Sequence, residues 1–344
     1  MDVATSSSVP SPWWLALETW ELRVFEDRRS RLARGDASFP FLDSSLLSPL
    51  LPRTLGPAKR YSREPAASPR ELGESSRAPI CTARVMAASY PQIVLFGDSI
   101  FQGAIDPVDG FSFQAALQSK VNRRYDVINR GLSGYNTSNA LAVLPQVFSP
   151  PGPGVPKIEY LFILLGANDA CIQLPTNHQH VPLDKYKINL RRIITHPTIS
   201  AHKPKIFIIT PPPLDQIRIT ELDLASGHPS ATRHAKISAS YSEAVRQVAA
   251  ENPGVTLVDL WKAVMDAAIK KTPAFDPNGP PLGYPEGQRG YLEHLLPDGL
   301  HLSSESYRIF YDLVSSFIDS NDEDRVLPEW RSAPWLEEDA YLKG

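Results

Sequence analysis

The sequence contains few cysteines for its length: only Cys81 and Cys171 occur among 344 residues. They lie in regions of very different composition, so we do not expect a disulfide framework. This scarcity of cysteine favours a reducing compartment, and we expect a cytoplasmic location. Import into an organelle stays open as an alternative, because arginine and serine are frequent near the N-terminus.

Long apolar runs and a strong net charge are also absent. The longest apolar runs, such as YLFILL at 160–165, are far shorter than the roughly 20 residues of a membrane-spanning helix. The N-terminus lacks a basic segment followed by an apolar core, which argues against a secretory signal. The formal net charge of −3 gives no electrostatic reason to expect nucleic acid as a partner.

The first part of the chain differs in composition from the rest. Residues 1–85 contain 9 prolines, 13 serines and 11 arginines, with no sustained period of two or 3.6 residues. Such a segment buries too little apolar surface to offset chain entropy, so we expect residues 1–88 to form a mostly disordered extension. Met86 is a candidate translation start for the compact domain, with residues 1–85 as an upstream extension of the reading frame. We predict a folded domain at 89–320 and a tail at 321–344.

Short β-rich runs alternate with helical patterns from Gln92 onward. We expect strands at 93–97, 125–131, 160–166, 205–210 and 255–259, and helices at 111–122, 136–148, 183–195, 230–251 and 303–319. Near-continuous apolar strands that alternate with helices are typical of a parallel sheet covered on both faces. We therefore predict an α/β fold, a three-layer α/β/α sandwich with a five-stranded, mainly parallel sheet.

Glycine and polar residues gather where the predicted strands end. Four such clusters occur: GDS at 97–99, NRGLSGYNT at 129–137, GANDA at 166–170, and PDGLHLSSES at 297–306 before the last helix. In open parallel sheets, sites form outside the carboxyl ends of the strands. We therefore expect these clusters to meet at one edge of the sheet.

Three residues in these clusters have the chemistry of acyl transfer. Ser99 is a weak nucleophile until a base accepts its proton, and the neutral imidazole of His301 suits that task. Asp298 lies three residues before His301, a spacing that allows its carboxylate to fix the imidazole tautomer. The candidate catalytic residues are therefore Ser99, Asp298 and His301.

An acyl-transfer site also needs hydrogen-bond donors for the negatively charged oxygen of the tetrahedral intermediate. The candidate donors of this oxyanion hole are the backbone N–H of Ser99, the backbone N–H of Gly131 and the side-chain amide of Asn168. Each cluster alone is also ordinary turn and helix-cap chemistry. The functional interpretation depends on their combination.

Other residues compete for these roles. Ser133 is an alternative nucleophile, but the pattern places no base beside it. Asp98 is an alternative acid, although next to Ser99 it is better suited to brace the loop by accepting backbone N–H groups. The histidines of HQH at 178–180 have no further ligand cluster nearby, so we predict no metal and no cofactor. The sequence Asn136-Thr137-Ser138 is expected to cap a helix.

Together, the four clusters resemble the blocks of the SGNH, or GDSL-type, serine hydrolases, and most of all the isoamyl acetate-hydrolysing esterase group. The resemblance runs from about Pro91 to Ile318, although Ile100 and Phe101 stand where leucine and threonine are frequent. It implies a flavodoxin-like sandwich without a metal. It also implies Ser99 as nucleophile, Asp298 and His301 as its triad partners, and Gly131 and Asn168 in the oxyanion hole.

The resulting expectation is a serine esterase that hydrolyses small carboxylic esters with water through an acyl-enzyme intermediate. Lysophospholipids, acyl thioesters and acetylated sugars are alternative substrates for the same residues. A non-catalytic α/β ligand-binding or interaction module is the alternative of another class, although no G-x-G-x-x-G or P-loop motif is present. A homodimer is left open. The Pro/Gly-rich segment 270–297 is expected to be a loop that influences specificity.

Overall fold

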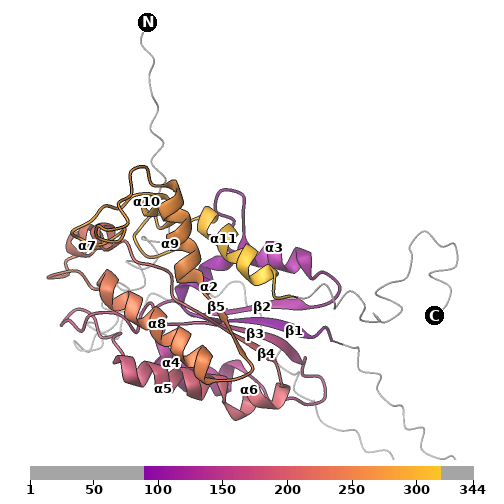
Figure 1. The fold of residues 1–344 in the computed structure, drawn as a ribbon. Helices are drawn as coiled ribbons and strands as arrows, with labels where there is room; N and C mark the ends of the chain where they lie inside the picture. Colours follow the sequence, from indigo (N-terminus) through magenta and orange to yellow (C-terminus); the bar gives the residue numbers. More distant parts are fainter. Residues whose placement is uncertain (1–88, 319–344) are drawn as a thin grey trace, which may run out of the picture. The chain divides into compact units, whose positions relative to one another are not determined.

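The computed structural model describes residues 89–318, which form one sheet with helices on both faces (Figure 1). The strands are β1 (Gln92–Gly97), β2 (Asp126–Gly131), β3 (Ile158–Leu164), β4 (Lys205–Ile209) and β5 (Val255–Val258). All neighbouring strands are parallel, and their order is β2-β1-β3-β4-β5. The five predicted strands and their parallel arrangement are confirmed, and the order is that of flavodoxin-like sheets.

The helices form two layers around this sheet. They are α2 (Ser99–Gln102), the 3-10 turn η2 (Gly103–Ile105), α3 (Phe113–Lys120), α4 (Thr137–Val147), α5 (Leu183–Ile194), α6 (Pro197–His202), α7 (Gln216–Ala225), α8 (Ala235–Glu251), α9 (Leu260–Lys271), α10 (Leu292–Leu295) and α11 (Ser304–Ser315). In Figure 1, α3, α9, α10 and α11 lie above the sheet, whereas α4, α5, α6 and α8 lie below it.

Each layer encloses its own hydrophobic core. Successive side chains of a strand point to opposite faces, so Ile93 and Leu95 of β1 join the core beneath α3, α9 and α11. Val94 and Phe96 join the core that faces α4, α5 and α8. All four side chains are buried, as a parallel sheet covered on both faces requires. The predicted three-layer sandwich is confirmed.

The helices differ from the sequence prediction in two respects. The helix expected from residue 230 begins only at Ala235, because the Ile172 N–H donates to the Thr232 carbonyl and holds that segment extended. The structure also contains helices that were not among the expected ones: α2, α6, α7, α9 and α10. The buried positions Leu260, Val264 and Ala268 of α9 do follow a helical period.

Some expectations concern residues outside the described range. The predicted extension at 1–88, the start at Met86, the tail at 321–344 and Cys81 all lie there. Within 89–318, Cys171 is a buried free thiol. Burial raises the pKa of this thiol, as expected for a structural cysteine. No helix between residues 89 and 318 is long and apolar enough to cross a membrane.

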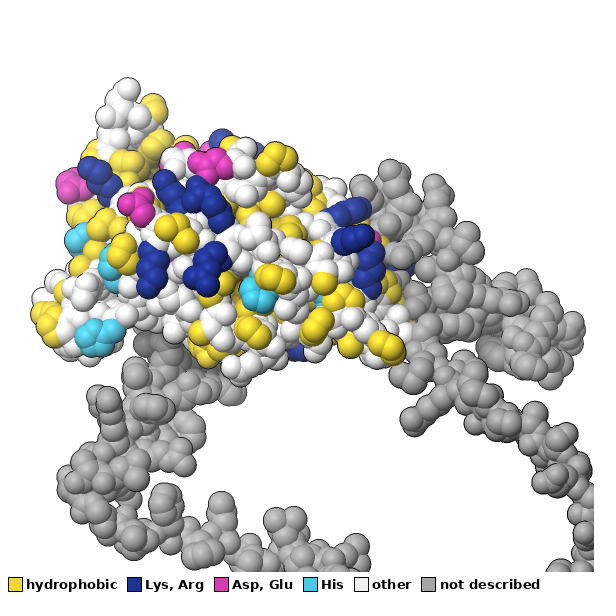
Figure 2. Space-filling model, turned by 90° about the horizontal axis from the view of Figure 1, so that it is seen from below, with side chains coloured by type: hydrophobic (Ala, Val, Ile, Leu, Met, Phe, Trp, Pro, Cys, Tyr) yellow, Lys and Arg dark blue, Asp and Glu magenta, His cyan; other side chains and the backbone are white. Residues whose placement is uncertain are grey.

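The surface beneath the sheet is mixed in character. Figure 2 shows this face, where Lys and Arg side chains stand in separate groups between hydrophobic and uncharged side chains. A nucleic-acid-binding face usually carries its basic side chains as one continuous patch or stripe. This face of the described domain has no such stripe.

Candidate active site

Ser99, His301 and Asp298 form a chain of hydrogen bonds at the carboxyl edge of the sheet. The Nε2 atom of His301 lies 2.9 Å from the Oγ of Ser99. Its Nδ1 atom lies 2.6 Å from the Oδ2 of Asp298. The side chains of Ser99 and His301 are part-buried and Asp298 is buried. The structure therefore brings together the three candidate catalytic residues in the order that a nucleophile, a base and an orienting carboxylate require.

The carboxylate of Asp298 is fixed by its own turn. Its Oδ1 accepts the backbone N–H of Leu300 at 3.0 Å and that of His301 at 2.7 Å. Burial alone raises the pKa of Asp298, but His301 and these two N–H donors outweigh it, so the pKa lies below its ordinary value. An ionised carboxylate is the form that accepts the imidazole N–H.

Asp98 braces the start of α2, as the sequence suggested. Its Oδ1 accepts the Ile100 N–H at 3.0 Å, which makes Asp98 the N-cap of the helix that begins with Ser99. Its other oxygen, Oδ2, is buried and has no hydrogen-bond partner within the described residues. Burial raises the pKa of Asp98 to about 6, although the Ile100 N–H and the charges of His301 and Arg233 lower it.

Gly131 lies close to this helix, but its N–H is already engaged. A Cβ atom at Gly131 would lie 2.1 Å from the backbone nitrogen of Gln102, so only glycine lets β2 approach α2 so closely. The Gly131 N–H donates to the Oδ1 of Asn129 at 2.8 Å. This hydrogen bond engages the donor that the sequence prediction assigned to the oxyanion hole, and the role of Gly131 there stays a prediction.

Gly134 follows in the same cluster, and its N–H differs from that of Gly131 in its hydrogen bonding. Within the described residues, the N–H groups of Leu132 and Tyr135 are bonded to backbone carbonyls, and that of Ser133 to the Oε1 of Gln102. No partner within 89–318 accepts the N–H of Gly134 or that of Ser99. Gly134 has φ +76°, a left-handed conformation that favours glycine. Sequence spacing alone did not distinguish the two glycines of this cluster.

Asn168 is held between two partners. It is 3% exposed, and its Nδ2 donates to the Tyr135 carbonyl at 3.0 Å. Its Oδ1 accepts from the Nη2 of Arg233 at 2.9 Å. Because an amide nitrogen carries two hydrogens, one N–H remains for another acceptor. Arg233 lies 65 positions from Asn168 and was not among the predicted site residues.

Asp169, the neighbour of Asn168, anchors the start of α4. Its carboxylate accepts both the backbone N–H and the hydroxyl of Thr137, at 3.0 Å and 2.5 Å. Asn136, the residue before Thr137, caps α4 with its side chain, as expected from the sequence. Burial raises the pKa of Asp169 to about 7, against the lowering effect of the Thr137 hydrogen bonds.

The rival residues do not form a second site. Ser133 is exposed, and its hydroxyl has no hydrogen bond to a histidine among the described residues. Within residues 89–318, no group of three or more His, Cys, Asp or Glu side chains could hold a metal ion. The histidines at 178 and 180 therefore give no metal-ligand cluster there.

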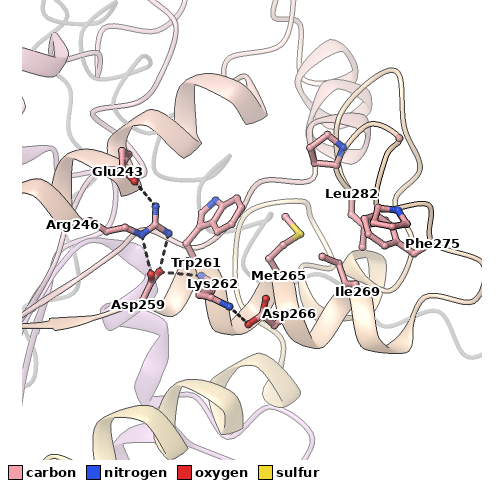
Figure 3. A pocket seen from close by; sticks show the side chains of 13 residues that line it. Glu243, Arg246, Asp259, Trp261, Lys262, Met265, Asp266, Ile269, Phe275 and Leu282 are labelled. Carbon is pink, nitrogen blue, oxygen red and sulfur yellow. Dashed lines mark hydrogen bonds and ion pairs between the residues drawn. The ribbon is translucent and has the colours of Figure 1, made fainter.

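A pocket of about 590 Å³ lies away from these residues, between α8, α9 and the segment 275–282 (Figure 3). Arg246 extends over its rim to Asp259 and Glu243, and Trp261 and Met265 line its interior. Neither Ser99 nor His301 lines it. The predicted Pro/Gly-rich loop at 270–297 has no helix or strand at 272–291, and part of it lines this pocket. Its two ends differ from the prediction, because α9 extends to Lys271 and α10 spans Leu292–Leu295.

The sequence also resembles a known family. Residues 95–309 match the model of the GDSL-like Lipase/Acylhydrolase family. Isoamyl acetate-hydrolyzing esterase 1 homolog of Mus musculus is 35% identical over 181 residues, which cover 51% of this chain and 68% of the mouse protein. Isoamyl acetate-hydrolyzing esterase of Saccharomyces cerevisiae is 30% identical over 240 residues, covering 67% of this chain and 87% of the yeast protein.

Among solved structures, a lipase/acylhydrolase from Enterococcus faecalis is similar with a TM-score of 0.46 and 24% identity. The alignment covers 66% of this chain and 95% of the bacterial chain.

Proposed function

The chain belongs to the GDSL-like lipase/acylhydrolase family and is a carboxylic ester hydrolase, and we propose that it is a serine esterase for small esters with short acyl groups. The observation that carries the proposal is the hydrogen-bonded chain from Ser99 through His301 to Asp298. The preference for acetate-type esters is supported by the names of the mouse and yeast relatives, which describe hydrolysis of isoamyl acetate.

In the proposed acylation step, the Nε2 of His301 takes the proton of Ser99 while the Ser99 Oγ attacks the ester carbonyl. The resulting oxyanion would be bound by the N–H of Ser99, the N–H of Gly134 and the free N–H of Asn168. Asp298 keeps the imidazole oriented and stabilises its charged form. His301 then gives its proton to the departing alcohol, which leaves an acyl group on Ser99.

In the proposed deacylation step, a water molecule replaces the alcohol. His301 takes a proton from this water, and the water oxygen attacks the acyl carbon. The second tetrahedral intermediate collapses, the Ser99 Oγ leaves and regains a proton from His301, and the carboxylic acid is released. The net reaction is ester plus water to acid plus alcohol, and no cofactor takes part.

Ester hydrolysis by matched variants tests this proposal. We expect the full chain to hydrolyse p-nitrophenyl acetate with a burst of p-nitrophenol when acylation is faster than deacylation. Ser99→Ala should reduce kcat by roughly 10⁴-fold or more while the melting temperature stays close to that of the wild type. Ser133→Ala is the matched control and should keep wild-type kcat. Unchanged turnover in Ser99→Ala would overturn the assignment.

A series of esters tests the substrate class. We expect kcat/KM to be highest for acetyl and butyryl esters and to fall for p-nitrophenyl palmitate, for a lysophospholipid, for an acyl thioester and for an acetylated sugar. A maximum on any of these last four substrates would overturn the assignment to small short-chain esters.

We propose a cytoplasmic location for this enzyme. The support is the buried free thiol of Cys171, which is typical of proteins kept in reducing surroundings. Fractionation of cells that express the full chain would test this, with the catalytic activity expected in the cytosolic fraction and its recovery in organelles as the contrary result.

A further inference from the structure

Arg233 is fixed beside the turn that carries Asn168. It lies in the extended segment before α8, where it forms an isolated antiparallel bridge with Cys171. The Ile172 N–H donates to the Thr232 carbonyl at 2.7 Å, and the Thr232 N–H donates to the Oδ2 of Asp223 at 2.6 Å. The backbone of Arg233 is therefore tied both to the turn after Asn168 and to α7.

The guanidinium of Arg233 spans two consecutive residues of this turn. Its Nε donates to the Ala167 carbonyl at 3.0 Å, and its Nη2 donates to the Oδ1 of Asn168 at 2.9 Å. A third donor, Nη1, lies 3.3 Å from the hydroxyl oxygen of Thr232. The planar guanidinium presents its donors in a fixed fork, and a lysine ammonium cannot reproduce this pair of contacts.

The contact of Arg233 with the Asn168 oxygen, together with the Tyr135 carbonyl that accepts from the Asn168 Nδ2 at 3.0 Å, determines which end of the Asn168 amide faces the site. The oxygen and nitrogen ends of an amide have nearly the same shape, so packing alone does not select between them. Arg233 has no acceptor, which obliges the Asn168 oxygen to point toward it and the nitrogen to point away. A reversed amide would present a partial negative charge to the oxyanion and remove one of its donors.

We infer that Arg233 is a positioning residue for ester hydrolysis, because it orients the Asn168 amide so that its N–H faces the carbonyl oxygen of the substrate. This inference rests on the proposed function. The positive charge behind the amide also strengthens the N–H as a donor, since hydrogen bonds in a chain polarise one another. That charge reaches the start of α2, where it lowers the pKa of Asp98 against the larger effect of burial.

A double-mutant cycle tests whether Arg233 acts through Asn168. We expect Asn168→Ala to lower kcat on p-nitrophenyl acetate by about 100-fold to 1,000-fold. Arg233→Met should lower kcat by about 10-fold to 100-fold with KM changed less than about threefold. In the Asn168→Ala background, Arg233→Met should lower kcat by less than about threefold. A multiplicative loss in the double variant would overturn the inference.

Further variants separate orientation from general damage to the fold. Arg233→Lys keeps the charge but reaches one acceptor, so kcat should fall by about threefold to tenfold even if Arg233→Met does not fold. We expect guanidinium chloride at millimolar concentration to restore part of the kcat of Arg233→Ala but none of that of Arg233→Ala/Asn168→Ala. Wild-type kcat in Arg233→Lys, or equal rescue of both variants, would overturn the inference. Arg191→Met, at an exposed ion pair with Glu251, is the control and should keep wild-type kcat.

The same set of proteins distinguishes the two possible failures. If Ser99→Ala keeps its activity, the proposed function fails. The inference about Arg233, which rests on that function, then fails with it. If Ser99→Ala and Asn168→Ala lose activity but Arg233→Met keeps wild-type kcat, the proposed function stands and only the role of Arg233 is overturned.

Discussion

The Nε2 of His301 lies 2.9 Å from the Oγ of Ser99, although 202 positions separate the two residues in the chain. Two local structures create this contact. Ser99 begins α2 at the end of β1, and His301 lies just before α11. The hydroxyl of Tyr307 on α11 donates to the Ile100 carbonyl on α2 at 2.6 Å, so the two helices are joined directly beside the pair.

The two glycines of the cluster after β2 are expected to respond differently to alanine. In Gly134→Ala, the φ of +76° costs about 1 kcal/mol for a residue with a Cβ, and the altered N–H direction should lower kcat by about 10-fold to 100-fold. Its Cβ would lie 3.3 Å from the Nε2 of Gln179, which a flexible side chain accommodates. Wild-type kcat in this variant would contradict the donor role of Gly134.

Gly131→Ala, in contrast, should mainly lower the free energy of unfolding. Its Cβ would lie 2.1 Å from the backbone nitrogen of Gln102, so α2 must move and the free energy of unfolding should fall by about 3 kcal/mol or more. Chemical denaturation of both variants beside the wild type measures the difference. A Gly131→Ala protein as stable as the wild type would show that the close approach of β2 and α2 is not required.

Asp169 should make the folded domain less stable as the pH rises. Its pKa is raised from 3.8 to about 7 in the folded state, so between these values the folded state holds a proton that the unfolded chain has lost. The free energy of unfolding therefore falls between about pH 4 and pH 7 and is level above that range. Asp98, whose pKa is raised to about 6, also lowers the free energy of unfolding as the pH rises from about 4 to about 6.

Asp169→Asn should remove the part of the pH dependence of the unfolding free energy that comes from Asp169, and the part that comes from Asp98 should remain. Between pH 5 and pH 7.5, the wild type should lose roughly 2–3 kcal/mol more of its unfolding free energy than the variant. Urea unfolding at the two pH values, followed by circular dichroism, checks this. Equal losses in both proteins would contradict the raised pKa of Asp169.

The ion pair of Arg289 and Asp215 is expected to hold the Asp298 turn in place. Asp215 is fully buried, and its Oδ2 lies 2.6 Å from the Nε of Arg289. The Asp215 N–H donates to the carbonyl of Gly299, the residue after Asp298, at 2.9 Å. Arg289→Ala leaves a buried carboxylate without its partner, so the free energy of unfolding should fall by about 3 kcal/mol.

The matched control for Arg289→Ala is Lys262→Ala, because Lys262 and Asp266 form an exposed ion pair with side chains 63% and 59% exposed. Such pairs contribute about 0–1 kcal/mol. We also expect a lower kcat in Arg289→Ala and an unchanged kcat in Lys262→Ala. Equal unfolding free energies for the two variants would refute the anchoring role of Arg289.

The segment before the described domain is expected to be dispensable for catalysis. Among the described residues, those from 93 to 318 already form two hydrophobic cores, and residues 1–85 are rich in proline, serine and arginine. A chain that starts at Met86 should therefore keep the kcat and the melting temperature of the full chain. A loss of either would show that the N-terminal segment contributes to the catalytic domain.

The strands and most of the candidate site could be predicted from the sequence, because they depend on local patterns. Short β-rich runs that alternate with helical patterns predicted all five strands. The spacing of Asp298 and His301 predicted that both side chains lie on one side of the turn, and the structure places Nδ1 of His301 2.6 Å from Oδ2 of Asp298. Ser99 and Asn168 could be placed at the same sheet edge because carboxyl ends of parallel strands share that edge.

Other parts depend on partners that the local pattern does not reveal. Arg233 is a single basic residue in an irregular segment, and only the fold brings it to Asn168. The engagement of the Gly131 N–H by Asn129 had a local signal, because an asparagine side chain often accepts the N–H two residues further on. That signal was outweighed by the glycine-rich pattern of the cluster. In α9, the Pro/Gly-rich continuation after Lys271 obscured a clear helical period.

Covalent labelling of the nucleophile tests the central claim most directly. The full chain would be treated with a fluorophosphonate probe, and the labelled peptide would be located by mass spectrometry in the wild type, Ser99→Ala and His301→Ala. The account predicts one label per chain on Ser99, no label in Ser99→Ala, and labelling slowed by about 100-fold or more in His301→Ala. A label on Ser133 or on any residue other than Ser99, or undiminished labelling of Ser99→Ala, would contradict it.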